Sequence, residues 1–451
     1  MSTDINKITI ISGGTATNEL VSLFSQLSNN NNVSYILPIS DNGGSTSEII
    51  RVIGGPAIGD IRSRLTRLIP NNQESLRNLL SFRLSPNSQI AKQQWNEIVE
   101  GTHELWNPIS SSTKEIFRCF FVHLHVELLK RSRIHQSTKR IFRYELANIG
   151  NLFLTGVRLF IGSLDSSIEL FCKLTGIDSN INVLPCINTN FTYHISALLE
   201  NGFIITGQSQ ISHPSELQIY PPPINKTRPP TPTDEIDGYF EVPVNEVAMR
   251  RLSIDSFISD EEESGNVPQY THPELKKSQL HFNKSENIEP LKAPIKRIFY
   301  ISPYGEEIKP AANNRCISTI SNTDVLVYSI GSLMTSIIPV IILKGIGKAI
   351  ANSQSKKVLL LNGCLDRETF GMTALDFVKT IVEAAEYSQD KINEPWNKYV
   401  THLLYMKNPK IKVDVLQLEV QGIKCIHVDK IEGTEFFDLN HLQSIFNHTI
   451  F

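Results

Sequence analysis

The chain opens with short apolar runs that alternate with helical periodicity. Residues 8–11 are apolar, a glycine-rich turn follows, and apolar positions recur at helical spacing through 20–27 before a second apolar run at 33–39. This order predicts the start of a parallel, doubly wound sheet. Later apolar runs predict further strands, at 182–187, 203–208, 295–301, 325–330 and 358–361. The fold class indicated is therefore α/β, with a mostly parallel sheet.

Two segments depart from this alternation. Residues 70–145 show helical spacing without strand-like runs, which predicts a helical insertion or cap. Residues 221–294 are rich in Pro, Ser and Glu, which predicts a long disordered loop. Because strand character resumes after this loop, residues 1–451 are predicted to form a single domain. Near the end, 413–420 and 423–428 have the alternation of two edge strands.

Composition narrows the functional classes. The chain is 40% hydrophobic and 20% charged with a net charge of −3, so it offers no global attraction to nucleic acid or to an anionic membrane. Six scattered cysteines form no C-x-x-C pair, which disfavours a zinc module and a disulfide framework. The first residues lack signal-peptide features, and no apolar stretch approaches the roughly 20 residues that a membrane span needs. We expect a cytoplasmic protein.

The first candidate site follows the first predicted strand. A glycine pair there, Gly13 and Gly14, precedes Thr15 and Asn18 at the start of a helical segment. Glycines allow a phosphate to approach the backbone, and a helix N-terminus adds partial positive charge. A plain strand-to-helix turn would give the same pattern, and both interpretations remain open at this point.

The second predicted strand ends in a similar loop. Asp41 is followed by Gly43, Gly44 and Ser45, and in a parallel sheet this loop lies at the same carboxyl edge as the first. An aspartate here can contact a ribose hydroxyl or hold Mg²⁺ beside a diphosphate. The alternative is a helix N-cap or an Asx-turn.

Two further loops carry glycines. In one, Gly59 and Asp60 precede Arg62 and Arg64; either arginine can bind a phosphate with two hydrogen bonds, while Asp60 as a helix N-cap is the alternative. The other follows a later strand and combines a glycine with a hydroxyl-rich helix start, in Gly331, Ser332, Thr335 and Ser336. Three glycine-bearing loops at successive strand ends, with this repeat, predict a pocket at one sheet edge.

Six ordered motifs make the sequence resemble a known family. They are SGGTATNEL, SDNGGSTSEI, GGPAIGDIRSRL, NIGNLFLTG, SIGSLMTSIIP and NGCLDRETFGMTALDFV. Their order is that of the family of 2-phospho-L-lactate transferases (CofD-type) and YvcK-type gluconeogenesis factors. The resemblance implies a Rossmann-like domain whose pocket takes a nucleotide diphosphate. In this family the transferases move a phospholactyl group onto a deazaflavin alcohol with Mg²⁺, and the YvcK-type relatives bind UDP-sugars.

Matching the motifs residue by residue gives a set of candidate site residues. Those predicted to bind the ligand are Gly13, Gly14, Thr15, Asn18, Gly43, Gly44, Ser45, Gly59, Arg62, Asn151, Gly331, Ser332, Thr335 and Asn362. Asp41 and Asp60 are the predicted catalytic residues, and Asp41 is also the predicted metal ligand. The last motif additionally matches at Glu368, Thr369, Gly371 and Asp376. Four positions depart from the family pattern, which usually has Gly at Ala16, Asp at Asn42 and His at Ala147 and Phe377.

Two functions from different classes follow. The first is a UDP-sugar-like nucleotide-diphosphate binder that can also transfer a phospho group, with or without Mg²⁺. The second is a non-catalytic metabolite sensor that acts through a protein partner, which the missing histidines favour. A homo-oligomer remains open. Ser253, preceded by two arginines within the predicted loop, is a candidate phosphorylation site for a protein kinase.

Overall fold

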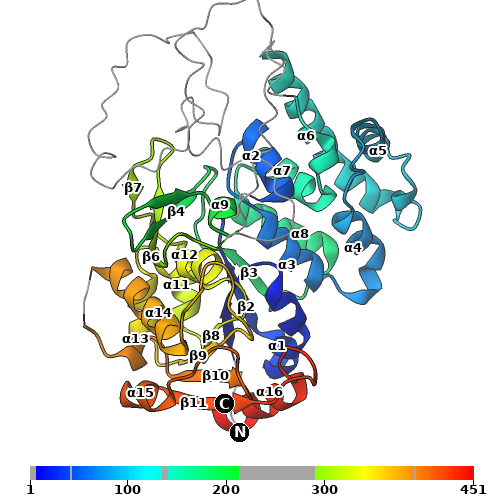
Figure 1. Ribbon diagram of the computed structural model, residues 1–451. Helices are drawn as coiled ribbons and strands as arrows, with labels where there is room; N and C mark the ends of the chain where they lie inside the picture. The colour runs from blue at the N-terminus through cyan, green and yellow to red at the C-terminus, as the bar shows by residue number, and fades with distance from the viewer. Residues whose placement is uncertain (1–6, 41–42, 135–140, 213–289, 391–392) are drawn as a thin grey trace, which may run out of the picture.

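A seven-stranded parallel sheet forms the centre of the protein (Figure 1). The computed structural model describes residues 7–40, 43–134, 141–212, 290–390 and 393–451. The strands are β1 (Ile8–Ile11), β2 (Val33–Leu37), β3 (Asn182–Pro185), β8 (Val325–Tyr328), β9 (Lys356–Leu360), β10 (His402–Met406) and β11 (Lys424–Val428). Their order in space is β11-β10-β9-β8-β1-β2-β3. The predicted fold class, a doubly wound, mostly parallel α/β sheet, is confirmed.

The strand order changes direction beside β1. The chain runs outward from β1 through β2 to β3, and later returns to the other side of β1 as β8. Ile8 therefore pairs with Val33 on one side and with Val325 on the other. Every residue of β1, β2 and β8 is buried, which explains their mostly apolar sequences. In such sheets ligands bind at the carboxyl edge where the order reverses.

A smaller antiparallel sheet packs beside the parallel one. It contains β5 (Ile204–Thr206), β4 (His194–Leu199), β6 (Ile295–Ile301) and β7 (Glu307–Ile308), in that order. The predicted strands at 203–208 and 295–301 thus exist, but they belong to this sheet and not to the parallel one. β4 pairs with both β5 and β6. The segments before and after residues 213–289 therefore meet in one structure.

The segment of the chain that connects β2 to β3 is helical. They are α2 (Gly44–Val52), α3 (Gly59–Leu68), α4 (Glu74–Ser81), α5 (Ser88–Glu100), α6 (Ser111–Ile134), α7 (Ile149–Ile161) and α8 (Leu164–Thr175), with short 3₁₀ turns η3 (Asn71–Gln73), η4 (Glu104–Trp106) and η6 (Tyr144–Leu146). Phe153 of α7 packs against aromatic rings of two neighbouring helices. Its ring contacts Phe117 and Phe121 of α6 and Phe171 of α8, at centroid separations of 4.5, 5.7 and 6.0 Å. An aromatic cluster thus joins α6, α7 and α8.

The remaining helices flank the two sheets. They are η1 (Ala16–Leu20), α1 (Val21–Leu27), η2 (Asn29–Asn31), α9 (Gln208–Ser212), α11 (Asn314–Ser321), α12 (Ile338–Ile341), α13 (Ile346–Asn352), α14 (Ala374–Gln389), η8 (Trp396–Lys398), α15 (Val415–Val420) and α16 (Leu439–Ile445), and two π-helical turns, η7 (Leu333–Ile337) and η9 (Phe446–Ile450). Within the described ranges, no helix is long and apolar enough to cross a membrane.

Two sequence predictions are corrected. Residues 413–420 form no strand; α15 takes their place, because β10 and β11 are parallel and must be joined by a crossover. Only part of the apolar alternation there is used for packing, since Leu418 is fully buried whereas Leu416 and Val420 are 80% and 83% exposed. The third glycine loop follows α2 and not a strand. Of the predicted disordered loop at 221–294, residues 221–289 lie outside the described residues.

Candidate functional site

The glycine pair after β1 packs tightly against two other segments. A Cβ atom at Gly14 would lie 2.5 Å from Asp60 Oδ1 and 2.6 Å from Asp60 Cα, and one at Gly13 would lie 2.6 Å from Ser336 Oγ. Glycine is therefore required here for packing, whichever ligand binds. The same contacts place Asp60 directly beside the turn. Ile58, and not Asp60, is the N-cap of α3, so the capping alternative for Asp60 is wrong.

Hydrogen bonds connect the β1 turn to α3. Ser63 Oγ donates to the Gly14 carbonyl oxygen at 3.0 Å, and Asn18 Nδ2 donates to Ser63 Oγ at 3.1 Å. The Oδ1 atom of Asn18 is buried without a hydrogen-bond partner among the described residues. Thr15 is exposed and caps η1 without a side-chain hydrogen bond. The predicted residues of the first and third loops thus share one location.

The loops after β8 and β9 join this edge. Thr17 Oγ1 donates to Ser329 Oγ at 3.0 Å and to the Ile330 carbonyl oxygen at 3.1 Å. Asn362 accepts a hydrogen bond from the Gly331 amide at 3.1 Å and donates to the Gly331 carbonyl oxygen at 2.7 Å. Gly331 has φ = +128°, a backbone angle that favours glycine. Hydrogen bonds therefore link the loops that follow β1, β8 and β9 at the switch point.

Arg64 lies buried beneath the β1 turn. It donates to the Gly13 carbonyl oxygen at 3.2 Å, and its guanidinium stacks on the Tyr35 ring at 4.6 Å from the ring centroid. Burial lowers the pKa of Arg64 to about 10, while the nearby hydroxyl of Tyr35 and the Asp60 carboxylate oppose this decrease. The group therefore remains charged at neutral pH. Its Nε and Nη1 atoms have no hydrogen-bond partner within the described ranges.

Arg62 points from α3 toward α7. Its Nε atom donates to Asn151 Oδ1 at 3.3 Å, and a Cβ atom at Gly150 would lie 2.9 Å from Arg62 Cγ. Burial is the main cause that lowers the pKa of Arg62 to about 10, with a smaller contribution from the charge of Arg83, and Asp60 opposes both. The predicted residues Arg62 and Asn151 are therefore in contact, and Asp60 interacts electrostatically with Arg62 as well as with Arg64.

The second predicted loop is described only in part. Asp41, the predicted metal ligand and catalytic residue, lies outside the described residues. Gly43 is the N-cap of α2, and Gly44 has φ = +54° with open space where a Cβ atom would lie. The buried Ser45 accepts a hydrogen bond from the Asn148 amide at 3.0 Å, so its hydroxyl oxygen supports the start of α7.

Glu368 forms a buried hydroxyl cluster with Ser212, Ser332 and Thr335. Thr335 Oγ1 donates to Glu368 Oε1 at 2.9 Å, and the hydroxyls of Ser212 and Ser332 also donate to this carboxylate. Burial is the main cause that raises the pKa of Glu368 to about 6, followed by the charge of Asp366, and the three hydroxyls oppose it. While Glu368 is ionised, Ser332 and Thr335 direct their protons toward it. They then offer lone pairs, and no protons, to a phosphate.

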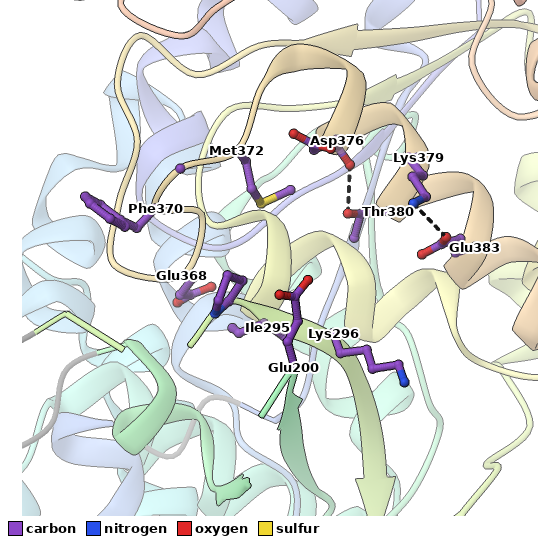
Figure 2. Close-up of a pocket in the computed structure, with 12 residues that line it drawn as sticks. Glu200, Ile295, Lys296, Glu368, Phe370, Met372, Asp376, Lys379, Thr380 and Glu383 are labelled. Carbon is purple, nitrogen blue, oxygen red and sulfur yellow. Dashed lines mark hydrogen bonds and ion pairs between the residues drawn. The ribbon is translucent and has the colours of Figure 1, made fainter. Parts of the chain in front are cut away.

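A pocket with a volume of about 540 Å³ adjoins this cluster (Figure 2). It lies between the antiparallel sheet and α14, and its lining residues are Glu200, Pro294, Ile295, Lys296, Glu368, Phe370, Gly371, Met372, Asp376, Lys379, Thr380 and Glu383. Several of its polar groups bond to one another. Lys379 pairs with Glu383 at 3.7 Å, and Thr380 Oγ1 donates to the Asp376 carbonyl oxygen at 2.8 Å. Glu368 connects this pocket to the β8 loop.

Sequence reasoning missed Ser63, for which a signal existed, and it missed the contact of Glu368 with the β8 loop, for which no local signal existed. Asp60, Ser63 and Arg64 are spaced i, i+3 and i+4, which places them on one face of α3. That face meets the β1 turn, whereas Arg62 meets α7. Glu368 matches the last motif, yet its contact with Ser332 joins segments 36 residues apart, which no local pattern reveals.

Fold and site together define a Rossmann-like α/β protein with glycine-bearing loops collected at its switch point. Residues 8–438 match the family model described as 2-phospho-L-lactate transferase CofD, and the chain belongs to this family. The resemblance inferred from the six motifs is thereby confirmed. The uncharacterized protein YNL011C of Saccharomyces cerevisiae is 45% identical over 449 residues, which cover 95% of this chain and 97% of the relative.

Solved structures show the same fold. The X-ray structure of protein BH3568 from Bacillus halodurans matches with a TM-score of 0.58 at 16% identity, covering 99% of this chain and 100% of that chain. A second crystal structure of BH3568, described as a member of the upf0052 family, matches with a TM-score of 0.59 at the same identity and coverage. At this identity the likeness concerns the fold alone.

Proposed function

We propose that the chain binds a nucleotide diphosphate, of the UDP-sugar type, at the carboxyl edge of the parallel sheet and transfers a phospho group from it. The observation that carries the proposal is the convergence of the loops after β1, β8 and β9 with the start of α3 at the topological switch point. This is the place where open α/β sheets bind their ligands. A cytoplasmic location remains a prediction.

The charges at this edge support an anionic ligand. Arg62 and Arg64 both flank Asp60, and one carboxylate cannot neutralise two guanidiniums. The unpartnered buried Nε and Nη1 atoms of Arg64 give a further reason, because a buried donor without an acceptor costs free energy. A diphosphate would supply the missing negative charge and acceptor oxygens.

Asp60 would serve the transfer step. In such a reaction an acceptor hydroxyl attacks phosphorus, a new P–O bond forms, and the bond to the leaving nucleotide phosphate breaks. The carboxylate of Asp60, beside the Gly14 backbone, can accept the hydroxyl proton. Backbone amides of the glycine turn would stabilise charge on the diphosphate oxygens. Asp41 keeps its predicted role as a second carboxylate.

The residues at this edge fit Mg²⁺ only together with a ligand. Among the described residues, no group of three or more His, Cys, Asp or Glu side chains could hold a metal ion. Mg²⁺ needs no such group, because one or two carboxylates and substrate phosphates are its usual ligands. Asp60, with the predicted Asp41, would hold it. When bound, the ion would neutralise charge on the diphosphate.

The non-catalytic sensor remains the second candidate. It is favoured by Ala147 and Phe377, which occupy positions where the family resembled usually has histidine, and both are buried in the core. A site without these two proton carriers can still bind a diphosphate through arginine and backbone amides. Product formation separates the two candidates.

Thermal unfolding with UDP-glucose, UDP and GDP, each with and without Mg²⁺, tests the proposal. A ligand at 100 times its dissociation constant adds about 2.7 kcal/mol to the stability. We expect Asp60→Asn, which preserves the side-chain shape beside Gly14, to change nucleotide affinity about tenfold or more, since it removes the charge that balances two arginines. Phosphate-product analysis by chromatography then shows turnover or its absence.

A charge-matched control is available on α16. Asp438 accepts a hydrogen bond from the His441 amide at 2.9 Å, and asparagine can replace it as an N-cap. Asp438→Asn removes the same charge and should leave nucleotide binding unchanged. Equal effects of both substitutions, or no stabilisation by any nucleotide diphosphate tested, would contradict the proposal.

A further inference from the structure

The pocket beside α14 is separate from the proposed nucleotide site, apart from Glu368, which adjoins both. It is formed by the end of β4, the segment that leads into β6, residues 368–372 and α14 (Figure 2). Its volume of about 540 Å³ is in the range of cavities that hold small organic molecules. The chemistry of the lining therefore indicates which class of ligand the pocket would accept.

Carboxylates outnumber ammonium groups in this lining. Among the described residues, the acidic side chains are Glu200, Glu368, Asp376 and Glu383, and the basic ones are Lys296 and Lys379. Lys379 pairs with Glu383 at 3.7 Å. Asp376 accepts hydrogen bonds from the amide and hydroxyl of Thr373 in the cap of α14. The carboxylates of Glu200 and Glu368 are the two that these contacts leave for a ligand.

Glu200 and Glu368 lack a cationic partner within the described ranges. Glu200 is exposed at the end of β4, and in Figure 2 the Lys296 ammonium extends away from both carboxylates. Glu368 is 5% exposed, and burial followed by the charge of Asp366 raises its pKa to about 6. The groups that lower this pKa are neutral hydroxyls. The pocket therefore has an unbalanced negative charge.

Phe370 and Met372 give the pocket an apolar side. In Figure 2 both side chains lie across the pocket from Glu200. The Phe370 ring is 72% exposed, although aromatic side chains usually bury most of their surface. The face of an aromatic ring attracts cations, and a thioether adapts to apolar groups of different shapes. An acidic side and an aromatic side together fit a cation that carries an apolar body.

We propose that this pocket binds an organic cation, a small molecule with a protonated amine or a quaternary ammonium group on an apolar body. The cationic group pairs with the carboxylates of Glu200 and Glu368, and the apolar body packs against Phe370 and Met372. A diphosphate would meet these carboxylates with like charge, so the pocket and the glycine-bearing loops suit ligands of opposite charge. The proposal does not depend on the proposed function.

A bare metal ion fits the pocket less well than an organic cation does. In the part of the chain that the structure describes, no group of three or more His, Cys, Asp or Glu side chains could hold a metal ion. A single ion would also leave the Phe370 ring uncovered and most of the volume of about 540 Å³ unfilled. An organic cation uses both the acidic and the apolar side.

Calorimetric titration of the full chain with matched phenols tests the charge preference. Tyramine carries an ammonium group, tyrosol has a hydroxyl in its place, and para-hydroxyphenylacetate has a carboxylate. At neutral pH we expect tyramine to bind about tenfold or more tightly than tyrosol, and para-hydroxyphenylacetate to bind more weakly than tyrosol. Putrescine and choline extend the titration to cations of other shapes.

Substitutions test the location with the cation that binds most tightly. Glu368→Gln should weaken its binding about tenfold, and Glu200→Gln, at an exposed position that the fold does not depend on, should weaken it about threefold. Glu100→Gln is the matched control, because it removes the same charge at the exposed end of α5, far from α14 in Figure 1.

Three results would overturn the proposal. The first is that tyramine, putrescine and choline all fail to bind at millimolar concentrations. The second is that tyrosol binds as tightly as the best of these cations. The third is that Glu100→Gln weakens binding as much as Glu200→Gln does. Because no nucleotide is present in these titrations, their failure is distinct from failure of the proposed function.

Discussion

Glu368 is a buried carboxyl of the candidate site whose ionisation the fold opposes. The carboxyl is 5% exposed and accepts hydrogen bonds from Ser212, Ser332 and Thr335. These hydroxyls stabilise the charged form, but burial and the charge of Asp366 outweigh them, so the pKa of Glu368 rises to about 6. Glu368→Gln removes the titrating group and keeps its shape. The substitution should therefore change how stability depends on pH.

The magnitude follows from the pKa in the two states. A rise from the ordinary 4.5 to about 6 in the folded protein corresponds to about 2 kcal/mol. Between these two pH values the folded state holds more protons than the unfolded state at this position, so the free energy of unfolding decreases as pH rises. The destabilisation caused by the ionised Glu368 carboxylate is absent below pH 4.5 and complete above about pH 6. On going from pH 4.5 to pH 7, the free energy of unfolding of Glu368→Gln should therefore rise by about 2 kcal/mol relative to that of the unsubstituted chain.

Urea unfolding at several pH values between 4 and 7.5 measures this difference. The comparison of interest is the change in stability with pH for each protein, because a constant offset from the altered hydrogen bonds then cancels. Glu383→Gln, at an exposed glutamate of α14, is the control, since solvent screens its charge. If Glu368→Gln and the unsubstituted chain keep parallel stability curves across this range, the assigned pKa and its cause are wrong.

Two further predictions concern the packing that supports the site. Asn148→Ala should lower the free energy of unfolding by about 2 kcal/mol, because the buried Asn148 Oδ1 accepts a hydrogen bond from the Gly150 amide and so caps α7. Asn87→Ala, at the exposed cap of α5, should lower it by about 1 kcal/mol. Phe153→Ala should cost about 3–5 kcal/mol in urea unfolding, because it leaves a cavity among the rings of α6 and α8, while Phe191→Ala, at a 61% exposed ring, should cost far less.

Local sequence patterns predicted the buried parallel strands and the glycine turns that follow them. The runs at 8–11 and 325–330 are almost entirely apolar because helices cover both faces of a parallel sheet. The glycine turns at strand ends predicted which loops would share an edge, since all parallel strands end on the same side. That inference required no knowledge of strand order.

Other features depend on contacts between distant residues. The strand at 295–301 pairs with β4 in an antiparallel sheet, and its own sequence does not distinguish that partner from a parallel one. Residues 413–420 alternate like a strand, but the connection between parallel strands overrides this local preference. The role of Glu368 arises only when α9, η7 and the loop after β9 meet. Such features require the tertiary structure.

The structure also changes how the departures from the family pattern are understood. Ala147 is fully buried and Phe377 is 2% exposed within the core, so a histidine at either position would need a hydrogen-bond partner inside the protein. If this chain performs phospho-group transfer, its proton acceptor must come from carboxylates at the sheet edge. This reasoning makes Asp60, between the Gly14 turn and two arginines, the residue on which the proposed chemistry most depends.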